Sequence, residues 1–396
     1  MTAGSRAADC IRFITRLFPV AARPFLVIIA LAFLICVTYV HSAVATGRMT
    51  DELAWVDRSL KPLWAPPYDA KMYYYAIHHP SFARLVYRFV LHRMGVYELD
   101  RPPVNYELSA EENYARGSFV PREIELPLRL VNVAFLSGMI TLVYLAYKRF
   151  LGNRALAVAG CLPLLFNAPI LTGPCPYIGA DAMLLFWAAA FWFAWVMLAN
   201  RGGMCVFVLA VIGGFLVSTK INGVFTLLGA CVYFAVTANG LRRLVYPLIL
   251  VVIPLGIFAA LNPIYRAGDV TWATKVAKDV LGMMTYLKEK STSRDWGQFS
   301  RAEVLRESFP YWLLYIPALG VIAAARREKW FGPTAAWAAA TVIPNLFLIY
   351  MPLPRYCAVI SVGFLVLFSA AGIRLILETF GPAGPNRDIS QAPEAG

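Results

Sequence analysis

The chain has 396 residues, of which 59% are hydrophobic and only 15% are charged, and its mean hydropathy is +0.61. Soluble domains carry about a quarter charged residues, so this balance excludes an ordinary soluble protein and predicts an integral membrane protein. The net charge of +13 would suggest nucleic-acid binding in a soluble protein. Here an excess of Lys and Arg in short cytoplasmic loops explains it, and we expect no nucleic-acid partner.

Ten apolar runs are candidates for membrane-spanning helices, each of which needs roughly 20 mostly apolar residues. In chain order they lie at 24–43, 127–147, 155–172, 180–199, 204–218, 221–238, 244–262, 311–325, 333–351 and 357–377. We therefore predict an all-α polytopic membrane protein with one transmembrane domain at 1–380. The Pro- and Gly-rich segment 381–396 is typical of a disordered tail.

Clusters of Lys and Arg mark alternate connections between these spans. They comprise Arg6, Arg12, Arg16 and Arg23, then Lys148, Arg149 and Arg154, then Arg201, then Arg242 and Arg243, and finally Arg326, Arg327 and Lys329. All fall on one side of the predicted membrane, so the positive-inside rule places both termini and the tail in the cytoplasm. The Ala- and Arg-rich composition and the lack of eukaryotic retention signals favour a bacterial inner membrane.

The first apolar run has a second interpretation. Ala43-Val44-Ala45 resembles a signal-peptidase site behind an Arg-bearing N-terminal region. The run from Phe25 to Val40 is at the long end for a signal peptide, which favours a retained membrane anchor.

Two long segments, 44–126 and 263–310, remain on the extracytoplasmic side. Within the first, residues 81–94 repeat apolar side chains at helical spacing, while Arg84, Arg88 and His92 recur every four residues on another stripe. This pattern predicts a helix that lies in the membrane interface near lipid phosphates or packs on the bundle. Residues 270–287 give a weaker pattern of the same kind.

Charged residues near the outer membrane face are the candidates for function, because hydrocarbon does not solvate charges. They are Asp51, Glu52, Arg129, Asp181, Lys220 and Arg355. Each alone has a structural explanation: the acids suit helix starts, and the long bases reach the interface from a buried stem. Together, acids and bases on one face match what sugar transfer from a phosphate-linked donor requires, namely a base for the acceptor hydroxyl and cations for the departing phosphate.

These residues stand in an order that resembles the GT-C glycosyltransferases of the protein O-mannosyltransferase and aminoarabinose-transferase type. The similar elements are Asp51-Glu52 after the first span, Tyr73–Arg84 with His78-His79-Pro80 in the first outer loop, Arg129 and Gly138 in the second span, Gly179–Trp187, Ser218–Gly223 and Pro354-Arg355-Tyr356. The chain departs from the family pattern at Ser81, which replaces a second Pro, and at Ile77, which replaces an Asp.

The resemblance implies an inverting membrane glycosyltransferase with a polyprenyl-phosphate-linked sugar as donor and a GT-C-like bundle as fold. It makes Asp51 the general base, and it assigns Lys220, Arg355 and Arg84 to the lipid phosphate. Glu52, His79 and Asp181 would bind substrate, although Glu52 has a structural alternative and Asp181 alternatively orients Lys220. The pattern leaves open the sugar, a divalent metal at His78 or His79, and whether the acceptor is a glycolipid, a polysaccharide or a protein.

Two other classes of protein also place charges among many spans. A lipid-linked sugar flippase or other transporter usually shows repeated halves and charges near the bilayer midplane, whereas this chain shows no repeat and its charges gather at one face. A non-catalytic subunit that binds lipid phosphate would need the bases but not Asp51 and Asp181.

Overall fold

The structure is a computed structural model that describes residues 24–47, 50–61, 81–105, 108–151, 154–262, 301–308, 330–347 and 354–380. Those residues form helices and no strands. The helices are α2 (Pro24–Ile35), the π-helix η1 (Cys36–Val40), α3 (His41–Ala45), α4 (Thr50–Leu60), α6 (Ser81–Arg93), α7 (Ala110–Ala115), α8 (Arg122–Leu151), α9 (Arg154–Leu165), α10 (Ala168–Thr172), α11 (Asp181–Leu198), the 3-10 helix η2 (Ala199–Arg201), α12 (Gly203–Thr219), α13 (Gly223–Thr237), α14 (Arg242–Leu261), α16 (Arg301–Ser308), α18 (Phe331–Phe347) and α19 (Pro354–Phe380).

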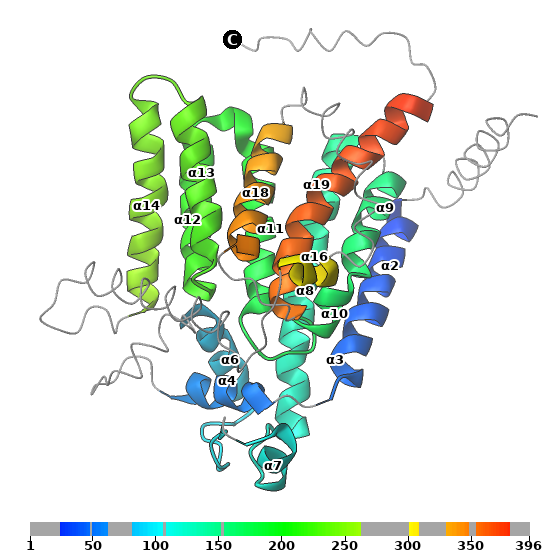
Figure 1. Cartoon of the computed structure of the whole chain (residues 1–396), viewed down its shortest axis with the longest axis vertical. Coiled ribbons are helices and arrows are strands. Elements are labelled where there is room, and N and C mark those ends of the chain that lie inside the picture. The colour runs from blue at the N-terminus through cyan, green and yellow to red at the C-terminus, as the bar shows by residue number, and fades with distance from the viewer. Residues whose placement is uncertain are drawn as a thin grey trace, which may run out of the picture.

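The long helices stand side by side as a bundle, and α4, α6 and α7 lie beyond its lower end (Figure 1). α11 packs between α8 and α12, while α18 packs between α13 and α19. Three tryptophans, Trp192, Trp195 and Trp337, are among the largest fully buried side chains of the described core. Close approach of α12 and α14 requires glycine at Gly214, where a Cβ atom would lie 2.6 Å from Ile257.

The bundle is that of an integral membrane protein. Among the described helices, three are long and apolar enough to cross a bilayer, namely Arg122–Arg149, Asp181–Arg201 and Arg242–Leu261. α14 also exposes a row of apolar side chains, Leu248, Val251, Val252 and Leu255. Helices in hydrocarbon satisfy their own backbone hydrogen bonds, so such a face is stable against lipid.

The predicted spans correspond to helices wherever the structure describes them. The first span consists of α2, η1 and α3, so Ala43–Ala45 ends a helix of the bundle. The span predicted at 155–172 is divided into α9 and α10, because Asn167 accepts a hydrogen bond from the Ile170 N–H at 3.2 Å and starts a new helix. The span at 311–325, the pattern at 270–287 and the tail at 381–396 lie outside the described residues.

The helix directions bring the candidate charges to one end of the bundle. Asp181 begins α11, Lys220 directly follows α12 and Arg355 is the second residue of α19, and these helix ends all lie toward α4 and α6 (Figure 1). The basic connections after α8 and before α14 lie at the opposite end. The predicted interfacial helix is α6, which packs on α4, α8 and α12.

Candidate active site

The acid pair lies in the first turn of α4. Asp51 and Glu52 are the second and third residues of this helix, where the helix dipole favours carboxylates. Leu53 and Val56 are buried, so α4 presents one apolar face to the protein beneath it. The Glu52 side chain is buried, with 1% of its surface exposed.

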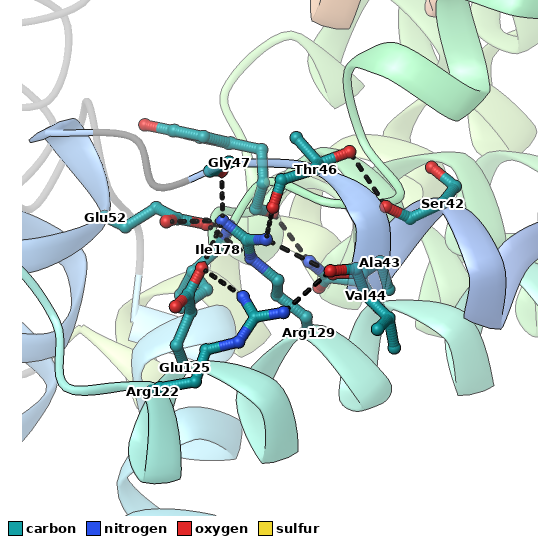
Figure 2. Close-up of polar contacts among 12 residues, drawn as sticks. Ser42, Ala43, Val44, Thr46, Gly47, Glu52, Arg122, Glu125, Arg129 and Ile178 are labelled. Atoms are coloured by element: carbon teal, nitrogen blue, oxygen red, sulfur yellow. Dashed lines mark hydrogen bonds and ion pairs between the residues drawn. The ribbon is translucent and has the colours of Figure 1, made fainter.

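Glu52 forms a paired contact with Arg129 of α8, which is fully buried (Figure 2). Arg129 Nε donates to Glu52 Oε1 at 3.1 Å, and Nη2 donates to Oε2 at 2.9 Å. The same guanidinium donates to the carbonyl oxygens of Ala43, Thr46 and Gly47 at 2.8 to 3.2 Å. Arg129 therefore joins the end of the first span to the start of α4.

A second carboxylate, Glu125, completes this network. Its Oε1 lies 2.6 Å from Arg129 Nη2 and 3.1 Å from Arg122 Nη1, and the Glu125 side chain is fully buried (Figure 2). Arg122 also donates to the Val44 carbonyl oxygen at 2.7 Å. Two carboxylates and two guanidinium groups thus balance in charge, as burial of ionised groups requires.

The loop at 173–180 lies directly against this network. The Ile178 N–H donates to Glu52 Oε1 at 3.0 Å, and Asn132 Nδ2 of α8 donates to the Tyr177 carbonyl oxygen at 2.6 Å. The hydroxyl of Tyr87, on α6, accepts from the Gly179 N–H at 3.1 Å and lies 2.8 Å from the Gly179 carbonyl oxygen. The segment that leads into Asp181 is therefore held by α4, α6 and α8 together.

Asp181 and Lys220 form a buried ion pair across the ends of α11 and α12. Lys220 Nζ lies 2.5 Å from Asp181 Oδ1, and the two side chains are 14% and 4% exposed. The Asp181 carboxylate thus contacts Lys220, as in the predicted alternative in which it orients that lysine. Lys220 Nζ also lies 4.8 Å from the centre of the Tyr356 ring.

Arg355 also contacts the Tyr356 ring. Its guanidinium carbon lies 5.4 Å from the Tyr356 ring centre and 5.1 Å from that of Tyr177. The backbone of the 173–180 loop lies close to the start of α19: a Cβ atom added at Gly173 would lie only 2.6 Å from the backbone nitrogen of Arg355. Cations are attracted to ring faces, so the Tyr356 ring is a common partner of Lys220 and Arg355.

The remaining predicted site residues have different placements. Arg84 is buried on α6, where Nε and Nη2 donate to the Arg58 carbonyl oxygen at 3.0 and 2.6 Å. Burial and, to a smaller extent, the charges of Arg58 and Arg88 lower the pKa of Arg84 to about 10, so it still carries its charge at neutral pH. His79 lies outside the described residues, and those residues contain no cluster of three or more His, Cys, Asp or Glu that could hold a metal.

Several residues of this site are absent from the sequence prediction. Glu125 stands four residues before Arg129, a spacing that places two side chains on one helix face and would have revealed the pair. Tyr87 and Asn132 carry no such local signal, because their partners lie far away in the chain. Tyr356 forms part of the predicted Arg-Tyr element, but its shared contact with two cations depends on the tertiary structure, which brings Lys220 to the second of these residues.

The arrangement of helices matches a solved structure. ArnT from Cupriavidus metallidurans, bound to undecaprenyl phosphate, superimposes with a TM-score of 0.55 over 89% of this chain, at 16% sequence identity. The fold is similar to that of ArnT. The chain spans only part of the length of ArnT, since the match covers 61% of the ArnT chain. No family model matches the chain, and no curated protein matches it in sequence. The similarity confirms the predicted GT-C-like fold.

Proposed function

We propose that the chain is a membrane glycosyltransferase that moves a sugar from a polyprenyl phosphate to an acceptor hydroxyl. The reaction takes place at the extracytoplasmic end of the bundle, in a bacterial inner membrane with both termini in the cytoplasm. The fold similarity to ArnT, solved with undecaprenyl phosphate bound, supports this donor class. The single observation that carries the proposal is that Lys220 and Arg355 both contact the Tyr356 ring while Lys220 is ion-paired with Asp181, at the end of the bundle where α4 lies.

Lys220 and Arg355 serve the leaving group. A polyprenyl phosphate leaves without needing a proton at neutral pH, so what it needs is compensation of its negative charge. Arg355 suits paired hydrogen bonds to phosphate oxygens, whereas Lys220 supplies a compact positive charge. Their common contact with Tyr356 supports a shared role at one phosphate. Asp181 orients Lys220 and, together with His79, binds hydroxyl groups of sugar or acceptor.

Asp51 acts as the general base. The acceptor oxygen attacks the anomeric carbon while its proton passes to the Asp51 carboxylate, so the new carbon–oxygen bond forms as the bond to the donor phosphate breaks. The bonding electron pair leaves with the phosphate, and a single displacement inverts the anomeric configuration. Glu52 stands next to this base in the sequence and has a positioning role, because its contacts with Arg129 and Ile178 fix the first turn of α4.

The test compares membranes that contain wild type, Asp51→Asn or Asp57→Asn, matched for folded protein and supplied with labelled polyprenyl-phosphate sugars. A positioned base contributes about 100- to 10,000-fold in rate, so Asp51→Asn should abolish measurable sugar transfer and release of free polyprenyl phosphate. Asp57 lies on the same helix with a side chain 48% exposed, so its variant should keep wild-type activity. Equal release by Asp51→Asn and wild type would refute the assigned base.

The phosphate role has its own test. Arg355→Ala should raise the concentration of donor needed for half-maximal rate, while the dependence on acceptor concentration stays unchanged. If Arg355→Ala leaves both donor affinity and rate at wild-type values, Arg355 does not hold the leaving phosphate.

A further inference from the structure

The outward face of α6 combines features that the proposed reaction does not use. Leu85, Arg88, Phe89, His92 and Arg93 line an open hollow of about 390 Å³ on this face. Phe89 is 63% exposed, and the Arg93 guanidinium carbon lies 5.5 Å from the centre of its ring. The hollow therefore offers cationic groups beside exposed apolar surface.

The inward face of α6 explains why these groups point outward. Ala83, Tyr87 and Leu91 are fully buried against the protein, and Arg84 is held by the Arg58 carbonyl oxygen. The stripe of basic residues predicted from the sequence is therefore divided, with Arg84 inside and Arg88 and His92 on the hollow. Within the described part of the chain, none of Arg88, His92 and Arg93 is ion-paired with a carboxylate.

The position of α6 places this hollow at the edge of the membrane. Ser81, which begins α6, donates from N–H and hydroxyl to Asn262 Oδ1 at 3.1 and 2.6 Å, and Asn262 directly follows α14. α14 is the helix whose exposed apolar row faces lipid. A helix that starts where a lipid-facing span ends lies at the depth of the lipid headgroups.

We propose that this hollow binds the headgroup of an anionic phospholipid of the surrounding bilayer. Arg88, His92 and Arg93 face the phosphate, and Phe89 and Leu85 lie against the glycerol and upper acyl chain. The charge of the hollow is complementary to a lipid phosphate, and the exposed Phe89 ring would be costly in water but not at the membrane interface. The site is separate from the proposed reaction and does not depend on sugar transfer.

The experiment uses the full chain in nanodiscs of phosphatidylcholine that contain phosphatidylglycerol and a trace of photoactivatable phosphatidylglycerol. Crosslinked peptides are located by mass spectrometry, with photoactivatable phosphatidylcholine in parallel. We expect phosphatidylglycerol to crosslink preferentially to residues 81–97. An arginine near an anionic surface contributes an affinity factor of about five, so Arg88→Gln with Arg93→Gln should lower the preference by up to about 25-fold.

The matched control is Arg242→Gln with Arg243→Gln, which removes two exposed arginines at the opposite end of the bundle. This control should retain the preference, and Arg88→Lys with Arg93→Lys should retain most of it. Two results would overturn the proposal: equal loss in both Gln variants, or equal crosslinking of the two lipids at α6. Loss of the crosslink in excess inorganic phosphate at constant ionic strength would also overturn it, since the site would then accept a free anion.

Discussion

Replacing Arg129 by methionine tests the buried network that holds the acid pair of α4. The guanidinium contacts six oxygen atoms, three of them carboxylate oxygens of Glu52 and Glu125 and three of them backbone carbonyl oxygens. Arg129 is fully buried, so the variant would leave Glu52 at 1% exposure without its cation. Breaking a buried pair by removing one partner costs about 3–5 kcal/mol, which is the loss of unfolding free energy that we expect.

The assay is denaturant unfolding in lipid–detergent micelles, with sugar transfer measured on the same preparations. Adding Glu52→Gln and Glu125→Gln to the methionine variant should recover most of the stability, because no uncompensated buried charge then remains. Arg122, whose side chain is 41% exposed, stays solvated in that triple variant. An unfolding free energy of the methionine variant within about 0.5 kcal/mol of the wild-type value would refute the reasoning, because changes that small are typical of substitutions at exposed positions.

Three further substitutions test the loop and the cations. Gly173→Ala forces a Cβ atom to within 2.6 Å of the start of α19 and should lower stability by about 1–3 kcal/mol in the same unfolding assay, whereas Gly256→Ala, with open space around it, should not. Tyr87→Phe leaves the Gly179 N–H without its acceptor and should lower stability by about 1–3 kcal/mol; an unchanged value would mean that water replaces the hydroxyl. Lys220→Met should reduce release of labelled polyprenyl phosphate by about 100- to 1,000-fold, and wild-type release would remove Lys220 from the proposed site.

Apolar runs and basic clusters were sufficient to predict the bundle. The spans follow from length and hydropathy, and the grouping of Asp181, Lys220 and Arg355 at one end follows from the alternating direction of the helices. The start of α7 also has a local signal in the sequence, because Ser109 and Glu112 form a capping box there.

The contacts inside the site were beyond sequence reasoning because they depend on tertiary packing. Glu52 was expected to bind substrate, with a structural alternative, and its burial under Arg129 favours the alternative. Helical spacing placed Arg84 with Arg88 on one stripe, but α4 packs over part of that stripe and buries only Arg84. A periodic pattern describes one helix, whereas burial is decided by the helices around it.

The hydrogen bonds from Ser81 to Asn262 also bear on the order in which the protein is made. These two residues are 181 positions apart in the chain. The carbonyl groups and the Glu52 carboxylate that bind Arg129 all lie within the 86 positions before it. At about 5–20 residues per second, a ribosome needs roughly 10 to 40 s to synthesise the chain between Ser81 and Asn262. The network around Arg129 can therefore form early in biosynthesis, whereas the bonds that join the start of α6 to the end of α14 form only after α14 has been synthesised.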